Sequence, residues 1–297
     1  MNERERLFMG SAKIKAFYRL TKPGVLYGNV LTSVAGFLLA ARGHVDVWLF
    51  MVTIVGMTLV IAAACVLNNY LDQDIDALMT RTKQRPSVTG EIKGAHMIAF
   101  SAILGALGIS VLYLWTNWLV TALAAFGFIT YVWLYGALSK RQSIHGTLVG
   151  SISGAIPIIC GYAAVANRVD AGLIITFLIL FFWQFAEFYS IAIYRRKEYA
   201  KAHVPVMPVV VGVRPTIAQI FVYTVLYVIS TLALTPFGYT GRVYFGVMLV
   251  SGLWWAWVGY RGFAAKDSDA WARRMFRWSM WLILLLCLML SIGPVLP

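Results

Sequence analysis

Nine long apolar runs are the feature that most constrains the fold of this chain. Runs of about 17 to 25 mostly apolar residues are long enough to cross the roughly 30 Å hydrocarbon core of a bilayer as α-helices. They occupy residues 24–41, 47–68, 96–115, 118–138, 144–166, 171–193, 216–236, 243–262 and 275–294. Only 12% of the residues are charged, against about 25% in soluble domains. The sequence predicts an all-α, polytopic integral membrane protein, with nine transmembrane helices in one bundle and a single domain, 1–297.

The basic residues are unevenly divided between the two ends of this predicted bundle. Of the 25 Lys and Arg residues, 22 fall in the N-terminal segment or in and next to the loops after the second, fourth, sixth and eighth spans. Such an excess marks cytoplasmic loops. We therefore expect a cytoplasmic N-terminus, an external C-terminus, and cytoplasmic segments at 1–22, 77–95 and 194–215, the last two forming active-site loops. The asymmetry also accounts for the net charge of +13, so no nucleic-acid partner is expected.

The cysteines and the N-terminal segment indicate which kind of membrane protein this is. Each of the three cysteines lies inside an apolar run, which indicates packing residues rather than a disulfide framework or a CxxC metal site. The first 22 residues are basic and lack the short apolar core and cleavage site of a removable signal. These features favour a prokaryotic plasma or inner membrane.

The second span ends in a cluster of polar residues, "NNYLDQDID". Asn68, Asp72 and Asp76 are spaced by four, so on a helix all three point to one side, while Asp74 lies on nearly the opposite face. Two carboxylates and an amide oxygen are the hard donors that Mg²⁺ prefers, and this ion usually completes its shell with water and phosphate. The spacing predicts a metal–diphosphate site. The alternative is that these are solvated residues at a helix end.

A basic segment follows directly, "RTKQRP", which supplies Arg81, Lys83 and Arg85. The fork of an arginine suits phosphate oxygens, and a lysine acts as a point charge. Pro86 disfavours helical geometry at Arg85, so we predict a loop that folds back over the acids and binds diphosphate. The alternative is the ordinary positive charge of a cytoplasmic loop.

The sixth span carries a second polar face. Projected at 100° per residue, its polar positions fall within roughly 80° of arc; they are Gln184, Glu187, Arg195 and Glu198. Glu187 lies two turns inside the span, where an ionisable residue is costly and by default functional. Neutralisation of neighbours for packing is the alternative. Glu198 could share a second metal with the first cluster, and Asn29 and Lys140 lie near the same membrane boundary.

The residues quoted so far resemble a known family signature. The matching positions are Asn68, Asp72, Ile75, Asp76, Met79, Arg81, Thr82, Arg85, Pro86 and Gly90. They are similar to the protohaem IX farnesyltransferase (haem O synthase) branch of the intramembrane aromatic prenyltransferase (UbiA-type) superfamily. The resemblance extends to "LTKPG", "GSISGAIPIICGY", "WQ" at Trp183 and Gln184, and "PVMPVVVG", and so covers most of the chain.

This resemblance implies farnesyl transfer from farnesyl diphosphate to a vinyl group of haem b, with Mg²⁺ as cofactor. The expected metal ligands are Asn68, Asp72 and Asp76, with Glu198 as a further catalytic residue. The expected diphosphate ligands are Arg81, Lys83, Arg85, Lys140 and Arg195. The expected acceptor pocket contains Asn29, Trp183, Gln184 and Glu187. The implied partners are the lipid bilayer and an assembly with a haem A synthase or terminal oxidase, and the implied site opens on the cytoplasmic side.

Three positions depart from the family pattern, and two other functions compete with it. Ala186 and Glu187 stand where the family usually has proline and histidine, and Glu198 stands where aspartate is typical. Prenyl transfer to a quinone-type or other aromatic acceptor would share the first cluster and differ around the sixth span. A transporter would instead place polar groups near the bilayer centre in both halves, whereas most of these groups cluster at one membrane face.

Overall fold

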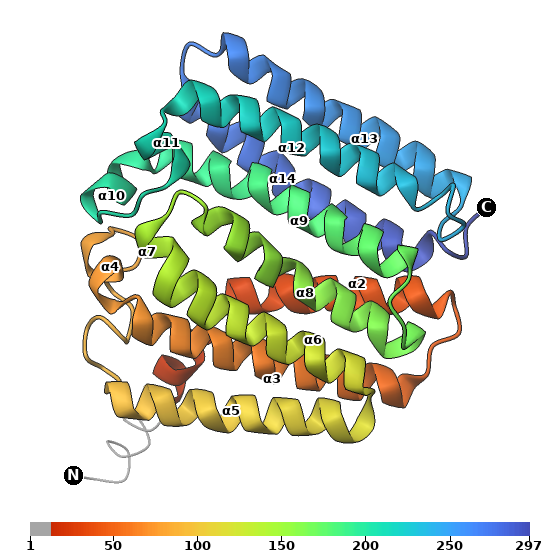
Figure 1. Cartoon of the computed structure of the whole chain (residues 1–297), viewed down its shortest axis with the longest axis horizontal. Coiled ribbons are helices and arrows are strands. Elements are labelled where there is room, and N and C mark those ends of the chain that lie inside the picture. Colours follow the sequence, from red (N-terminus) through yellow and green to blue (C-terminus); the bar gives the residue numbers. More distant parts are fainter. Residues whose placement is uncertain (1–12) are drawn as a thin grey trace.

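A computed structural model of the chain describes residues 13–297 as an all-helical bundle (Figure 1). Within that range, nine helices are long and apolar enough to cross a membrane, which confirms the predicted span count. They are α2 (Pro23–Ala41), α3 (Val47–Leu71), α5 (Gly94–Trp115), α6 continued by η1 and α7 (Trp118–Gln142), α8 (Gly146–Ala166), α9 (Ala171–Tyr194), α12 (Val213–Ala233), α13 continued by η2 (Arg242–Ala264) and α14 (Ser268–Ile292). Residues 1–12, part of the predicted segment 1–22, lie outside the described residues.

Two helices begin at least three residues earlier than predicted, each for a local reason. The last span was expected to start at residue 275, but α14 begins at Ser268. Its N-cap is Asp267, whose carboxylate accepts hydrogen bonds from the backbone N–H groups of Asp269 and Ala270. The first two turns are amphipathic, so a count of apolar residues misses them. The seventh span begins at Val213 rather than 216, because Pro215 falls in the first turn, where proline is tolerated.

The helices pack side by side, and the short ones gather at one end. Helix α3 packs on α5, α2 on α8, α8 on α9, and α9 on both α12 and α14. Figure 1 shows α4 (Gln73–Leu78), α7 (Lys140–Gln142), α10 (Arg196–Lys201) and α11 (Met207–Val210) together at one end, with the C-terminus at the other. The segments that carry the candidate site residues are therefore neighbours in space.

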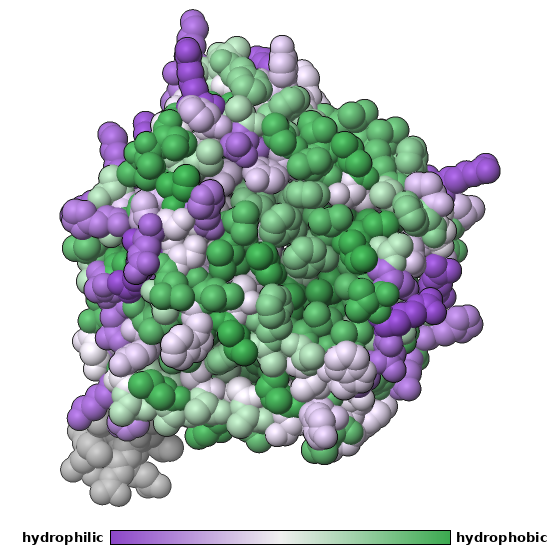
Figure 2. Space-filling view, viewed as in Figure 1, coloured by the Kyte–Doolittle hydropathy of each residue, from purple (hydrophilic) through white to green (hydrophobic). Residues whose placement is uncertain are grey.

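The surface has the pattern of a membrane-embedded protein. Figure 2 shows a broad hydrophobic face over the middle of the bundle, with hydrophilic residues concentrated toward its two ends. Exposed aromatic and aliphatic side chains along the helices include Trp118, Trp133, Val250 and Trp281. In water such a face would be costly, whereas lipid solvates it.

The second and sixth spans end in the same way. Helix α3 is followed by one non-helical residue, Asp72, and then the six-residue α4; helix α9 is followed by Arg195 and then the six-residue α10. Ile75 and Met79 pack in one cluster with Ala202 and Val204. The segment 194–215, predicted as a loop, thus contains α10 and α11, and its packing joins the polar ends of the two spans.

Helices α2 and α8 lie so close that their backbones touch, at one glycine on each helix. A Cβ on Gly161 would lie 1.9 Å from the carbonyl oxygen of Ser33, and one on Gly36 would lie 1.9 Å from that of Ile158. Small residues permit this closeness between membrane helices, where packing rather than water drives association. The contact fixes the position of α2 and of Lys22, which precedes it.

We expect Gly161→Ala to push α2 away from α8 and lower the apparent Tm in detergent by about 5 °C or more, because overpacking a buried contact costs about 1–3 kcal/mol. Gly28→Ala on α2 is the matched control, since nothing lies within 4 Å of a Cβ there. Thermal unfolding of the two variants, followed by circular dichroism, measures the difference. Equal Tm values for both variants would contradict this account of the interface.

Candidate functional site

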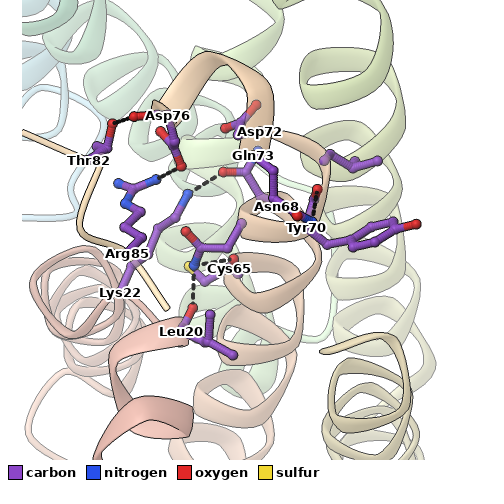
Figure 3. A network of polar contacts seen from close by, with 12 residues as sticks. Leu20, Lys22, Cys65, Asn68, Tyr70, Asp72, Gln73, Asp76, Thr82 and Arg85 are labelled. Carbon is purple, nitrogen blue, oxygen red and sulfur yellow. Dashed lines mark hydrogen bonds and ion pairs between the residues drawn. The ribbon is translucent and has the colours of Figure 1, made fainter. Parts of the chain in front are cut away.

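Three polar side chains at the end of α3 form the centre of the candidate site (Figure 3). Asn68, Asp72 and Asp76 are 2%, 2% and 3% exposed. The backbone N–H of Asp72 donates to the carbonyl of Asn68 at 3.0 Å, and that of Asp76 donates to the carbonyl of Asp72 at 2.8 Å. These hydrogen bonds continue the helical turn across the junction between α3 and α4, so the three side chains share one face. They are buried residues and not a solvated helix end.

Each of these three groups is paired with a basic side chain from another part of the chain: Asn68 with Lys22, Asp72 with Lys140, and Asp76 with Arg85. The Nζ of Lys140 lies 2.6 Å from Oδ2 of Asp72, and Nη1 of Arg85 lies 2.5 Å from Oδ2 of Asp76. Buried carboxylates require such partners, because an unpaired buried charge is strongly destabilising. The bases come from different elements, so the cluster ties the ends of several helices together.

Lys22 enters the site from the start of α2. Its backbone is left-handed (φ 50°, ψ 67°), it is the N-cap residue, and Pro23 opens the helix behind it. Figure 3 shows its side chain lying beside that of Arg85 and reaching Asn68. Burial and the positive charge of Arg85 lower the pKa of Lys22 to about 8, so this ammonium loses its proton more readily than a surface lysine does.

Lys140 is positioned by an uncommon helical segment. The fourth span changes from α6 (Trp118–Ile129) to the π-helix η1 (Thr130–Ser139), and Lys140 follows directly. Segments of π-helix are rare and often occur at functional sites. Here η1 presents Tyr131, whose hydroxyl donates to Oδ1 of Asn68 at 3.3 Å, and Tyr135, whose ring lies 5.9 Å from Nζ of Lys140. Sequence reasoning missed both tyrosines, since nothing in the residue pattern signals a π-helix.

Two buried atoms of the cluster have no hydrogen-bond partner among residues 13–297, Oδ1 of Asp72 and Nδ2 of Asn68. A free carboxylate oxygen beside an amide and a second carboxylate offers the donor chemistry of a Mg²⁺ site. Among residues 13–297, no group of three or more His, Cys, Asp and Glu side chains could hold a metal. A Mg²⁺ ion on Asn68, Asp72 and Asp76 would therefore take part of its coordination shell from water or from phosphate oxygens.

Asp74 lies on the outer face, as its spacing predicts, and has a structural partner there. Two nitrogens of Arg141 donate to its carboxylate at 2.6 and 2.7 Å, and Arg141 also donates to the carbonyl of Leu71 at 2.5 Å. The hydrogen bond from Arg141 lowers the pKa of Asp74 to about 2. Asp74 thus fastens α7 to the α3–α4 junction and does not point into the buried cluster.

The segment after α4 folds back over the acids, but its three basic residues are not equivalent. Arg85 reaches Asp76, and the hydroxyl of Thr82 donates to the carbonyl of Asp76 at 3.0 Å. Arg81 and Lys83 are exposed, and neither side chain makes a hydrogen bond or ion pair within the described chain. Of the three diphosphate ligands predicted in this segment, the fold thus brings Arg85 into the cluster and leaves Arg81 and Lys83 exposed.

The two charged residues at the end of the sixth span, Arg195 and Glu198, form an ion pair with each other. Nη1 of Arg195 lies 3.1 Å from Oε1 of Glu198, and the guanidinium of Arg195 stacks over the ring of Tyr194 at 5.4 Å. Both charged side chains are only half-buried. Among residues 13–297 Glu198 is not grouped with Asp72 and Asp76, and its carboxylate is paired with Arg195; a role for Glu198 at a metal stays a prediction.

The residues predicted for an acceptor pocket are not drawn into one contact network. Nε1 of Trp183 donates to the carbonyl of Ser279 on α14 at 3.1 Å, and Nδ2 of Asn29 donates to the carbonyl of Val25 on its own helix. Gln184 packs against Gly154 of α8, where a Cβ would lie 2.3 Å from its Oε1. Trp183 and Asn29 therefore have partners that a purely structural role would explain.

Glu187 on α9, unlike Trp183 and Asn29, has no such partner among the described residues. It is 9% exposed, and its carboxylate makes no hydrogen bond or ion pair with any residue in the range 13–297. Gln184, one turn earlier, has an Oε1 that also lacks a partner. Two buried polar groups without partners on one helix turn are costly. Of the polar residues predicted on the sixth span, these two are free to contact a bound molecule.

Comparisons with known proteins show the family of the chain. The family model described as the UbiA prenyltransferase family matches residues 29–281. The chain is similar to the protohaem IX farnesyltransferase of Chromohalobacter salexigens, with 45% identity covering 94% of this chain and 95% of the relative. For the enzyme of the same name from Serratia proteamaculans, the identity is 43% and the coverage 94% of both chains.

Two solved structures share the fold. A digeranylgeranylglyceryl phosphate synthase superposes with a TM-score of 0.80 at 18% identity, covering 96% of this chain and 99% of that one. A UbiA homologue from Archaeoglobus fulgidus, bound to DMAPP and Mg²⁺, superposes with a TM-score of 0.73 at 14% identity, covering 93% and 98%. At these identities the likeness concerns the fold alone.

Proposed function

The chain belongs to the UbiA prenyltransferase family, and on this basis we propose that it is a protohaem IX farnesyltransferase that converts haem b to haem O. The reaction joins the farnesyl group of farnesyl diphosphate to a vinyl group of haem b, and water adds to give a hydroxyethylfarnesyl side chain. The observation that carries the proposal is the buried cluster of Asn68, Asp72 and Asp76 with its three basic partners at one end of the bundle.

Departure of diphosphate is the step for which this cluster is suited. Asn68, Asp72 and Asp76 would hold Mg²⁺, which supplies electrostatic stabilisation of the charge that develops on the leaving oxygens. The free Oδ1 of Asp72 and the mixed carboxylate and amide donors fit that ion. Arg85 and Lys140 already lie against these acids, so each can turn to an anion bound beside them and stabilise it further.

The remaining basic residues form an outer set in this proposal. Arg81 and Lys83 are exposed at the edge of the cluster, and we assign them to attraction of the diphosphate as it enters. Arg195 is paired with Glu198 on α9–α10, and the packing of α4 against the segment after α10 brings that pair to the same end of the bundle. Glu198 then acts on the diphosphate site through Arg195 and not as a metal ligand.

The acceptor half of the reaction requires a water-poor environment and a few orienting groups. Apolar helix faces would hold the allylic cation away from bulk water until the vinyl carbon attacks. We assign the orientation of haem b to Glu187 and Gln184, because these buried groups lack partners within the described protein. Trp183 and Asn29 would then contribute to the wall of the pocket, with their polar atoms already satisfied.

We place the N-terminus and the diphosphate site on the cytoplasmic side of the cell membrane. The division of basic residues supports this orientation, since 22 of 25 lie on one side of the span order. The short helices α4, α7 and α10, which frame the polar cluster, lie at that same end of the bundle (Figure 1). Membrane-soluble substrates would reach the site laterally from the bilayer.

One assay tests the proposed reaction directly. The purified protein in detergent is incubated with haem b, farnesyl diphosphate and Mg²⁺, and the products are identified by mass spectrometry. We expect farnesylated haem that depends on all three additions. Parallel incubations replace haem b with a phenolic, quinone-type acceptor. Prenylation of that acceptor in the absence of any haem product would reassign the chain to another branch of the family.

Glu187→His restores the residue that the family usually has at this position, and we expect it to leave haem affinity equal or improved. Imidazole can ligate or hydrogen-bond haem without the cost of a buried unpaired carboxyl. Absorbance titration of the detergent-solubilised protein with haem b measures the dissociation constant. Complete loss of haem binding in this variant would show that the carboxylate itself has a role here.

A further inference from the structure

A hollow separate from the polar cluster lies on the outer face of α14. Its volume is about 460 Å³, and it is lined by Arg274, Arg277, Trp278 and Trp281. These residues are spaced by three and four, so they share one side of the helix. The inward positions of the same turns, such as Met275 and Ser279, are fully buried. The hollow therefore opens away from the bundle, toward the surroundings of the protein.

The two arginines of the hollow have no acidic partner. Both are exposed, and neither makes an ion pair or side-chain hydrogen bond with any residue from 13 to 297. The acids nearest in sequence are used elsewhere: Asp269 pairs with Arg196 of α10, and Asp267 caps α14. Arg273, their neighbour, faces the ring of Tyr194 instead. The hollow thus presents two guanidinium groups that no acid of the described part of the chain neutralises.

Tryptophans form the apolar part of the hollow. Trp278 packs edge-to-face on Trp254 of α13 at 5.6 Å, and Trp281 is 68% exposed. Exposed tryptophans of membrane proteins concentrate at the level of the lipid headgroups. Arg274 and Trp281 are seven residues apart, or about 10 Å along the helix axis. Positive charge and indole surface are therefore separated along the direction that a lipid molecule follows from its headgroup to its acyl chains.

The hollow lies at a defined end of the bundle. Figure 1 shows α14 starting at the same end as α10 and α11, and the ion pair between Arg196 and Asp269 joins α10 to the first turn of α14. The arginines are on the first three turns of α14, with a long apolar stretch following them. This order places the charges in the polar first turns of α14 and not inside its apolar stretch.

We propose that this hollow binds an anionic phospholipid, with the phosphate between Arg274 and Arg277 and the acyl chains against Trp278 and Trp281. A guanidinium fork is suited to phosphate oxygens. The exposed indole rings would gain no contact from a soluble anion, whereas they would pack against an acyl chain. Charge complementarity selects an anionic lipid over a zwitterionic one, since a choline group would face the same two arginines unfavourably.

The test compares lipid retention by the full-length protein, measured by native mass spectrometry after exchange into delipidated detergent with dioleoyl phosphatidylglycerol or dioleoyl phosphatidylcholine. We expect preferential retention of phosphatidylglycerol by the wild type. The double variant Arg274→Gln/Arg277→Gln should lose at least about tenfold of that retention, because each basic residue near a membrane surface contributes roughly a fivefold preference for anionic lipid. Arg214→Gln is the matched control, an exposed arginine in the first turn of α12, and should retain the lipid as the wild type does.

A second readout locates the acyl chain. Brominated phosphatidylglycerol should quench the tryptophan fluorescence of the wild type more than that of Trp281→Phe, because the lost indole is one that contacts the lipid. Equal retention of the two lipids by the wild type, or equal loss in the Arg214 and double variants, would overturn the proposal. Displacement of the lipid by inorganic phosphate at similar concentration would reassign the hollow to a soluble anion and would likewise overturn it. Neither readout requires haem or farnesyl diphosphate, so the result is independent of the proposed reaction.

Discussion

Asp72→Asn is expected to reduce the rate of farnesylated haem formation at least about 100-fold. On the proposed function it removes a metal ligand and with it several kcal/mol of transition-state stabilisation, and each 1.36 kcal/mol is a factor of ten. Asp76→Asn should behave similarly. The measurement is product formation under saturating substrates, with Mg²⁺ titrated in each variant. Removal of Mg²⁺ from the wild type by a chelator should produce a loss at least as large, restored by adding the ion back.

The structure supplies a control that separates chemistry from folding. Asp72 is buried against Lys140, so an uncharged residue there leaves a buried ammonium without a partner and lowers stability. Asp72→Asn/Lys140→Gln should regain the wild-type Tm while remaining inactive. Asp74→Asn, on the opposite face of the α3–α4 junction, should keep activity within about threefold, since the carboxylate that pairs with Arg141 is largely exposed. Near-normal rates in Asp72→Asn and Asp76→Asn would show that these acids are not the metal site.

Arg85→Gln is expected to reduce kcat/KM for farnesyl diphosphate by about 100-fold, because it removes a charge aimed at the leaving group. The direction in which the variant shifts the Mg²⁺ concentration for half-maximal rate distinguishes the role of Arg85 from that of the acids. Arg85 and a metal ion compete for the carboxylate of Asp76, so the Mg²⁺ concentration for half-maximal rate should stay constant or fall in Arg85→Gln. In Asp76→Asn the same quantity should rise.

Lys93→Gln is the control for loss of charge in the segment that carries Arg85, because Lys93 is exposed and lies just before α5. Its kcat/KM should remain within about twofold of the wild type, as is usual for surface substitutions. A loss of similar size in the Lys93 and Arg85 variants would mean that general attraction of the anion, and not a contact at the leaving group, explains both.

The predicted helices agree with the structure where hydropathy alone decides. The span predicted at 47–68 becomes Val47–Leu71, and the one at 171–193 becomes Ala171–Tyr194, because an uninterrupted apolar run has no alternative to a helix in lipid. Prediction was poorer for α14, whose first turns carry several arginines and are held by the cap at Asp267. There the helix continues past the apolar run into the polar boundary, which hydropathy does not detect.

The site was predictable to the extent that it is local. The spacing of Asn68, Asp72 and Asp76 placed them on one face because a helical turn sets that geometry. Their partners Lys22 and Lys140 lie 46 and 68 residues away in the chain, and only the packing of α2 and η1 against α3 decides that they meet these groups. The difference between Arg85, which is paired, and Lys83, which is exposed, depends on the path of a loop that the sequence leaves open.

The pairing of the acids with bases has a consequence for the order in which ligands arrive. Lys22, Lys140 and Arg85 outnumber the carboxylates of Asp72 and Asp76 by one, so the cluster has a net positive charge before any ligand binds. A bare divalent cation would enter against that charge. A prenyl diphosphate carries more negative charge than one Mg²⁺ neutralises, so their complex is still an anion and is attracted to the site. On the proposed function, metal and diphosphate therefore enter together. The basic side chains that are paired with the acids before binding then become the groups that bind the phosphates.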